Sequence, residues 1–168
     1  MSFGYARAYT NDAVWMHFGP EGSEAPTLQY EAESLPVIAR GHCETNPQKM
    51  QEFHGPMWSG GAQLYCAAND GGFVELGFDV GKPGRYRLCV QATAAPDYGI
   101  VRIRFPGAAR AHDFDFYSGR VCPSGSLELG AFDFTARKYV LRFTSIGKNR
   151  SSEGFRFGID AIDLIAVK

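Results

Sequence analysis

The feature that most constrains this fold is an alternation of apolar and polar residues along most of the chain, with almost no helical periodicity. In residues 84–90 every second side chain from Tyr86 onward is apolar, and residues 138–146 repeat the pattern from Tyr139. Each such strand has one apolar and one mixed face, which is what a sandwich of two packed sheets requires. The alternation therefore predicts an all-β chain.

Turn-forming residues divide this pattern into short segments. The segments that we expect to be strands are residues 27–35, 63–67, 73–80, 85–94, 100–105, 127–135, 139–146 and 157–167. Turns are expected at residues 69–72, 81–84, 105–108 and 123–126. Aromatic residues make up 14% of the chain and it contains 20 glycines, a composition suited to short strands joined by tight turns. We predict an antiparallel two-sheet β-sandwich of the jelly-roll type.

Length and charge limit the domain count and the class of partner. The 168 residues suit one domain, which we place at 27–168, with residues 1–26 as an N-terminal strand and linker or the tail of a preceding domain. The formal net charge is -1, which gives no electrostatic footprint for nucleic acid or an anionic membrane. The N-terminus shows no signal-peptide pattern, and no apolar run is long enough to span a bilayer. The cysteines, which permit two disulfides in three connectivities, are Cys43, Cys66, Cys89 and Cys122.

Two groups of carboxylates lie on expected strands. Glu31 and Glu33 are two residues apart and would share one face of the first strand, whereas Asp160 and Asp163 lie in the apolar last strand. Like charges this close repel unless something positive lies between them. The pair is either a solvent face with arginine partners or a site for a divalent cation held by oxygen ligands, which Asp160 would complete if the first and last strands are neighbours.

The order of several short motifs resembles carbohydrate-binding modules of families 6 and 35, which are β-jelly rolls with a galactose-binding-domain-like fold. The motifs are the acidic strand at 31–33, WSGG at 58–61, GRYRLCVQA at 84–92 and the closing IDAIDL at 159–164. The resemblance implies a structural Ca²⁺ whose carboxylate ligands would be Glu31 or Glu33 together with Asp160. Asp163 is expected on the other face of the strand, as a surface or salt-bridged residue. Residues 41–61 are expected to form a long loop.

Aromatic and polar residues in loops are the candidates for ligand binding. Sugar rings pack on aromatic side chains while neighbouring polar groups bond their hydroxyls. In the modules that the chain resembles, the loops at one end of the sandwich bind the ligand, and position there points to Trp58, Asp97, Tyr98, Tyr117 and Asn149. The alternative is that these rings cover the ends of the core.

The polar loop before the last strand is a further candidate. Lys148 and Asn149, with Arg150, supply several hydrogen-bond donors that would suit a uronate or sulfate group. The alternative is a solvated hairpin loop.

The motifs of serine hydrolases, zinc proteases and P-loop nucleotide-binding proteins are absent from the sequence. We therefore expect no catalytic residues and predict a non-catalytic carbohydrate-binding domain, an accessory module of a polysaccharide- or glycoside-acting protein. Its partners would be a poly- or oligosaccharide and a parent enzyme domain, and the resemblance favours a secreted protein. The alternative is a structural jelly-roll domain that forms homo-oligomers without a sugar, with residues 14–18 adding a strand to a neighbouring sheet.

Overall fold

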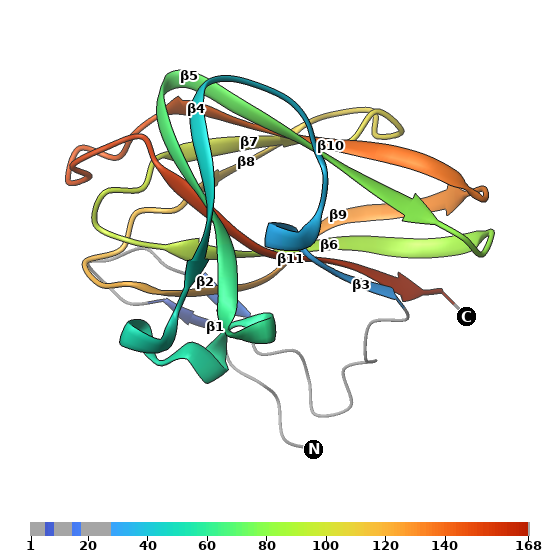
Figure 1. Ribbon diagram of the computed structural model, residues 1–168, viewed down its shortest axis with the longest axis horizontal. Helices are drawn as coiled ribbons and strands as arrows, with labels where there is room; N and C mark the ends of the chain where they lie inside the picture. Colours follow the sequence, from blue (N-terminus) through green and yellow to red (C-terminus); the bar gives the residue numbers. More distant parts are fainter. Residues whose placement is uncertain (1–5, 9–14, 18–27, 168) are drawn as a thin grey trace.

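The computed structural model describes residues 6–8, 15–17 and 28–167, which form strands and short 3-10 helices (Figure 1). The strands are β1 (Ala6–Ala8), β2 (Trp15–His17), β3 (Leu28–Glu31), β4 (Val37–Lys49), β5 (Ala62–Val80), β6 (Gly84–Ala94), β7 (Ile100–Arg104), β8 (His112–Asp115), β9 (Cys122–Phe134), β10 (Arg137–Gly147) and β11 (Phe157–Ala166). The 3-10 helices are η1 (Ala32–Ser34), η2 (Gln51–Phe53), η3 (Gly55–Met57) and η4 (Ser59–Gly61). The prediction of an all-β, antiparallel chain is confirmed, with a single parallel pairing of β2 with β9 between named strands.

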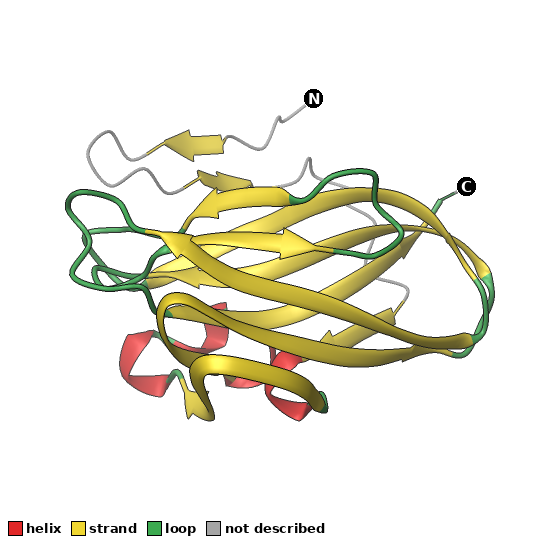
Figure 2. Ribbon diagram, turned by 90° about the horizontal axis from the view of Figure 1, so that it is seen from above, coloured by secondary structure: helices red, strands yellow, loops and turns green. Residues whose placement is uncertain are grey.

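The strands follow one hydrogen-bonded path that nearly closes on itself (Figures 1 and 2). Its order is β1-β2-β9-β6-β11-β5-β10-β7-β8, with β3 added to β11 and β4 added to β5. The first part of β5 pairs with β11 at 64–66, and its later part pairs with β10 at 73–80. Because β5 pairs with β11 through its first part and with β10 through its later part, it joins the two layers of strands. The sheet is therefore barrel-like and consistent with a jelly-roll sandwich.

The core follows the alternation in the sequence. Tyr86, Leu88 and Val90 are buried on β6, and Leu141 and Phe143 are buried on β10, as predicted. Strand β11 departs from alternation, because every residue from 157 to 164 is buried. It lies between β6 on one side and β5 and β3 on the other, and it also contacts η1. Because consecutive residues point to opposite faces, this burial means that both faces of the strand are covered, which accounts for its mostly apolar sequence apart from Asp160 and Asp163.

The structure differs from the sequence prediction mainly between residues 36 and 80. Half of the long loop expected at 41–61 belongs to β4, a largely exposed strand that among the described strands pairs only with β5. Such an edge strand can be polar and can hold Pro47, so it shows little alternation. The turn expected at 69–72 is wrong as well: β5 runs through it, with Gly71 at φ 75° and a register shift opposite His42. The turn expected at 123–126 lies within β9, where Gly125 has φ 76°.

Most of the N-terminal segment 1–26 lies outside the described residues, so its assignment as a linker stays a prediction. Its strand β2 pairs with β1 and β9 of the same chain. All four cysteines, which lie in the described part, are free thiols and buried. Within residues 6–8, 15–17 and 28–167, no helix has the length and apolarity needed to cross a membrane.

Candidate functional site

The acidic residues singled out in the sequence meet where the first and last strands of the domain pair. Glu31 ends β3, where it lies opposite Ala161 of β11, and Glu33 follows in η1. Asp160 is the extra residue of a β-bulge, since the register of β11 against β6 shifts between Ile159 and Ala161. The expectation that the first and last strands are neighbours is confirmed. A bulge re-aims one side chain without breaking the strand.

Ser59 of η4 joins two of these carboxylates. Its hydroxyl donates a hydrogen bond of 2.6 Å to Oε1 of Glu31, and its backbone amide donates one of 3.2 Å to Oδ2 of Asp160. The second oxygen of each carboxylate is buried and has no hydrogen-bond partner in the protein, and the same holds for Oε2 of Glu33. Buried carboxylate oxygens are ordinarily paired, so three orphaned ones at one place indicate that a positive group belongs there.

Burial and mutual repulsion change the acidity of this site. The pKa of Asp160 is raised to about 7, mainly by burial and further by the charges of Glu31, Glu33 and Asp163, and only the Ser59 amide acts against the rise. The pKa of Glu33 is also raised, again mainly by burial, with a contribution from Glu31. The free-energy cost of ionising the cluster is therefore high without a counter-charge.

The residues present fit a hard divalent cation. The atoms that could coordinate a cation are all carboxylate oxygens, and Ca²⁺ prefers oxygen ligands. Gly60 has φ 59°, and a Cβ on it would lie 3.4 Å from Oε2 of Glu31, so the glycine keeps side-chain atoms away from this buried oxygen. In the described part of the chain no three His, Cys, Asp or Glu side chains yet close around one point as metal ligands do. A cation would have to draw the carboxylates inward, and Ca²⁺ stays a proposal.

Asp163 does not lie at the surface and is not salt-bridged, which corrects the expectation from the sequence. It is 4% exposed and accepts hydrogen bonds from the side-chain amides of Gln29 at 2.9 Å and Gln91 at 2.6 Å. Its pKa is raised mainly by burial, and Glu31 adds to this rise. The error arises because every residue of β11 from 157 to 164 is buried, so facing away from Asp160 does not bring Asp163 to the surface.

A second group of predicted residues meets at one end of the fold, at the left of Figure 1. We call it the loop end, formed by residues 95–99, 116–121 and 147–156. The loops are joined by bridges from Ala95 to Tyr117 and from Tyr98 to Arg156. The amide of Glu153 also donates to the carbonyl of Pro96 at 3.0 Å. The loop end thus brings together the predicted residues Asp97, Tyr98, Tyr117, Lys148 and Asn149.

The polar members of this loop end have partners within it. Asp97 forms an ion pair of 2.6 Å with Arg156. The amide of Asn149 donates a hydrogen bond of 2.8 Å to Asp115. The ammonium group of Lys148 lies over the ring of Phe155, 5.3 Å from its centroid. The loops are therefore held in a fixed arrangement, as a preformed binding surface requires.

Trp58 and Tyr98 are packed inside the protein, which corrects the expectation that their rings are offered to a ligand. They are 3% and 4% exposed. The indole of Trp58 donates a 2.7 Å hydrogen bond to Thr93, whose hydroxyl donates to Gln63. The side-chain amide of Gln63 then donates to the hydroxyl of Tyr98 at 3.1 Å and to Gln48 at 2.7 Å. These residues form a buried polar network. The packing therefore favours the alternative interpretation, that the two rings belong to the interior of the protein.

Sequence reasoning missed Tyr65 and Arg156. Tyr65 lies on β5, half-buried, with its ring centroid 6.5 Å from that of Tyr98. Its pKa is raised mainly by burial; the charge of Arg156 lowers it and the charge of Asp97 raises it. Tyr98, beside whose ring Tyr65 lies, is bridged to Arg156 and follows Asp97 in the chain. Alternation offered no signal for Tyr65, because its neighbours Leu64 and Cys66 are apolar as well and its ring packs partly against the core.

No protein-family model and no curated protein matches this chain. Among solved structures, a xanthan lyase from Paenibacillus is 24% identical over 91% of this chain and 15% of its own, with a TM-score of 0.69. A GH26-CBM35 β-(1,4)-mannanase from Podospora anserina is 13% identical over 84% of this chain and 28% of its own, with a TM-score of 0.52. A family 35 carbohydrate-binding module from Clostridium thermocellum is 21% identical over 83% of this chain and 99% of its own, with a TM-score of 0.49.

The chain spans less than a third of the length of the lyase and of the mannanase that it matches. At sequence identities below 25%, these matches show a similar fold and nothing more. The expected resemblance to carbohydrate-binding modules is thereby confirmed as a likeness of structure: this chain has a β-sandwich similar to those found within carbohydrate-active enzymes.

Proposed function

We propose that this domain binds carbohydrate without catalysis, through the loop end, as part of a polysaccharide- or glycoside-acting protein. The observation that carries the proposal is the half-buried ring of Tyr65, whose centroid lies 6.5 Å from that of Tyr98, next to the partly exposed ion pair formed by Asp97 and by Arg156, the bridge partner of Tyr98. An aromatic face next to fixed polar groups is the combination that sugar binding requires. Tyr117, Lys148 and Asn149 line the same end.

The partners of the nearby carboxylates support binding rather than hydrolysis. A glycosidase needs two carboxyl groups that face each other across a cleft. Here Asp97 is paired with Arg156, Asp113 with Arg102 at 2.7 Å, and Asp115 accepts from Asn149. Each group is held as an ion pair or hydrogen-bond acceptor, which suits positioning more than proton transfer.

The metal has a structural part in this proposal. Ca²⁺ would be held by Glu31 or Glu33 and Asp160, where it would neutralise the cluster and tie β3, η4 and β11 together. It would contribute charge and rigidity to the jelly-roll sandwich, and sugar would bind elsewhere, at the loop end.

The test is a glycan array on the wild type, Tyr65→Ala and Arg156→Gln, each with and without EDTA. Arg102→Gln is the matched control, because it also breaks an exposed arginine–aspartate pair on the surface. We expect wild type and Arg102→Gln to bind the same glycans and the two loop-end variants to bind at least about tenfold more weakly. Equal binding by all four folded proteins would exclude the loop end, and binding by none would exclude the function.

Assembly without a sugar is the second candidate, and one observation favours it. On the edge strand β4, Val37 and Ile38 are 39% and 56% exposed. Exposed apolar residues on an edge strand favour pairing with another chain, although the rest of β4 is mostly polar. The segment 14–18 was the expected assembly edge, but β2 already pairs within its own chain. Light scattering of wild type and Ile38→Lys separates the candidates: assembly through β4 requires an oligomer that the variant loses.

A further inference from the structure

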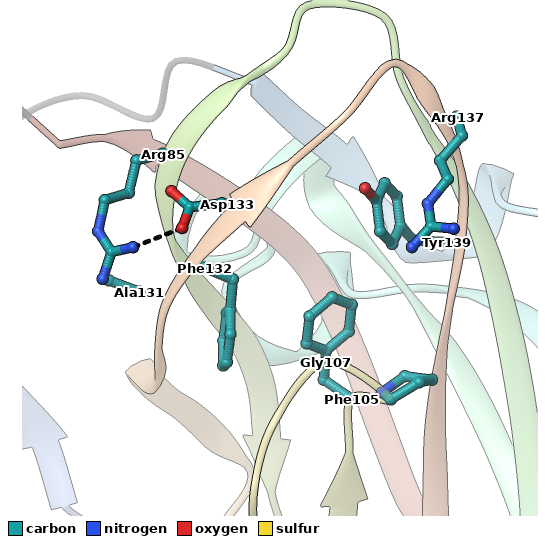
Figure 3. A pocket seen from close by; sticks show the side chains of 9 residues that line it. Arg85, Phe105, Gly107, Ala131, Phe132, Asp133, Arg137 and Tyr139 are labelled. Carbon is teal, nitrogen blue, oxygen red and sulfur yellow. Dashed lines mark hydrogen bonds and ion pairs between the residues drawn. The ribbon is translucent and has the colours of Figure 1, made fainter.

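A cavity of about 430 Å³ lies at the end of the fold away from the loop end (Figure 3). Its position follows from β10, whose first residues Arg137 and Tyr139 line the cavity, whereas its last residue, Gly147, leads into the loop end. Strand β6 runs in the same direction, from Arg85 near its start, which lines the cavity, toward the loop end. The two sites are therefore separated by the length of these strands.

Aromatic rings form the inner wall of this cavity. The ring centroid of Phe105 lies 4.9 Å from that of Phe132 and 5.9 Å from that of Tyr139. Phe105 is 4% exposed, whereas Phe132 and Tyr139 are only partly buried and keep a face toward the hollow. A Cβ on Gly107 would meet the ring of Phe105 at 2.7 Å, so the glycine lets the loop lie close against this wall.

Two guanidinium groups flank the aromatic wall on opposite sides, as Figure 3 shows. Arg85 forms an ion pair of 2.9 Å with Asp133. Arg137 lies over the ring of Tyr139, 4.8 Å from its centroid, and among the described residues no carboxylate is within ion-pair distance of it. Burial acts to raise the pKa of Tyr139, but the hydrogen bonds with Thr135, and then Arg137, lower it below its ordinary value. The lining thus carries two positive charges and one negative charge, with the excess on the Arg137 side.

We propose that this cavity is a second binding site, which takes a small ring that carries a carboxylate. The carboxylate would pair with Arg137, whose planar fork suits such a group, and the flat face of the ring would pack on Phe132. The volume is within the range of small-ligand pockets and large enough for one ring. The site is separate from the loop end and does not depend on it.

A second hollow of about 400 Å³ continues past Phe132. It shares Ala131 and Phe132 with the first cavity and adds Arg110, His112 and Glu128. A ligand that is an acidic sugar within a chain would therefore extend past Phe132, whereas a lone aromatic acid would fill the first cavity only.

The experiment is a titration followed by amide NMR shifts, with sodium glucuronate, sodium benzoate, a glucuronate-containing disaccharide and uncharged methyl glucoside as probes. Wild type is compared with Arg137→Gln and with Lys138→Gln, which removes the same charge from the next residue of β10. We expect millimolar binding of a carboxylate probe, with shifts at Gly107 and Ala131. Arg137→Gln should weaken it at least about fivefold and Lys138→Gln less than about twofold.

The probes also identify the ligand class. Tighter binding of the disaccharide than of glucuronate indicates an acidic sugar chain, and tighter binding of benzoate indicates an aromatic acid; either supports the site. Equal binding of methyl glucoside, equal effects of the two variants, or no shift at Gly107 and Ala131 with any probe would overturn it. Because the loop end has its own amides, a shift confined to Tyr98 and Gly154 would support the first site and overturn the second.

Discussion

The backbone amide of Ser59 donates a hydrogen bond of 3.2 Å to one oxygen of Asp160, across 101 residues of sequence, and the other oxygen of that carboxylate has no partner. One amide does not balance a buried charge that also faces Glu31 and Glu33. Without a counter-charge, the acidic cluster therefore costs folding free energy at neutral pH. With a cation it would instead fasten β3, η4 and β11 to one another.

We predict that Ca²⁺ stabilises the domain at neutral pH and that EDTA reverses the effect. Binding to the folded state at a hundred times Kd contributes about 3 kcal/mol, or about 5–10 °C in Tm for a domain of this size. Thermal unfolding with CaCl₂ and with EDTA measures this. Asp160→Asn should abolish the response, whereas Glu44→Gln, which changes an exposed carboxylate of β4, should keep it. An unchanged Tm in wild type would exclude a calcium site here.

We predict that, in EDTA, the free energy of unfolding falls as pH rises from about 5 to about 8. The pKa of Asp160 is raised to about 7 in the folded protein, so over this range the unfolded chain loses its proton first. This residue would account for a loss of about 2–3 kcal/mol between about pH 5 and about pH 8. The raised pKa of Asp163 acts in the same direction.

Urea unfolding at about pH 5 and at about pH 8 checks this expectation. Asp160→Asn should lose clearly less stability than wild type over the same interval, because it has no proton to release. If the two proteins show the same pH dependence, the burial of Asp160 does not control it.

We predict that Trp58→Phe destabilises the fold but leaves glycan binding nearly unchanged. The variant keeps a ring in the buried position and removes the indole donor to Thr93, which costs about 1–3 kcal/mol. Thr93→Val removes the other partner, and the double variant should cost less than the sum of the two single variants. Urea unfolding measures the free energies and the glycan array measures binding. A loss of binding in a folded Trp58→Phe would show that the indole contacts ligand.

The strands that sequence could predict are those that share an apolar face with the core. Strands β6 and β10 lie close to their expected ranges, because the residues that alternate in the sequence at 86–90 and 139–143 include those that they turn toward the core. Strand β4 was missed because it is an edge, where exposure removes the apolar signal. The glycines at 71 and 125 signalled turns, but each is accommodated within a strand at positive φ.

The acidic cluster could be predicted from the sequence more completely than the loop end. Glu31, Glu33 and Asp160 could be brought together because neighbouring first and last strands are a property of topology. The bulge at Asp160 could not be foreseen, and neither could the burial of Asp163 between two glutamine side chains. For the ligand-binding candidates, position identified loop residues, including Trp58 outside the loop end, but not the burial of the Trp58 and Tyr98 rings. Trp58 and Tyr98 are buried because partners for their polar atoms, Thr93 and Gln63, lie on distant strands.

The last prediction concerns Gly158, which lies on β11 beneath the buried polar network. A Cβ at this position would collide with the side-chain oxygen of Gln63 and would lie 2.9 Å from the hydroxyl of Tyr98. Gly158→Ala must therefore displace Gln63, which is 1% exposed, and break its bonds to Thr93 and Tyr98. We expect a loss of about 2–4 kcal/mol in the free energy of unfolding.

Gly81→Ala is the matched control for this variant, because a Cβ there has no neighbour within 4 Å. It should change stability by less than about 0.5 kcal/mol. Because Tyr98 also connects β5 to the loop end through its bridge to Arg156, Gly158→Ala should weaken glycan binding as well as stability. Chemical denaturation and the array, run on both variants, measure the two effects; a Gly158→Ala protein as stable as Gly81→Ala would show that the network does not hold these strands together.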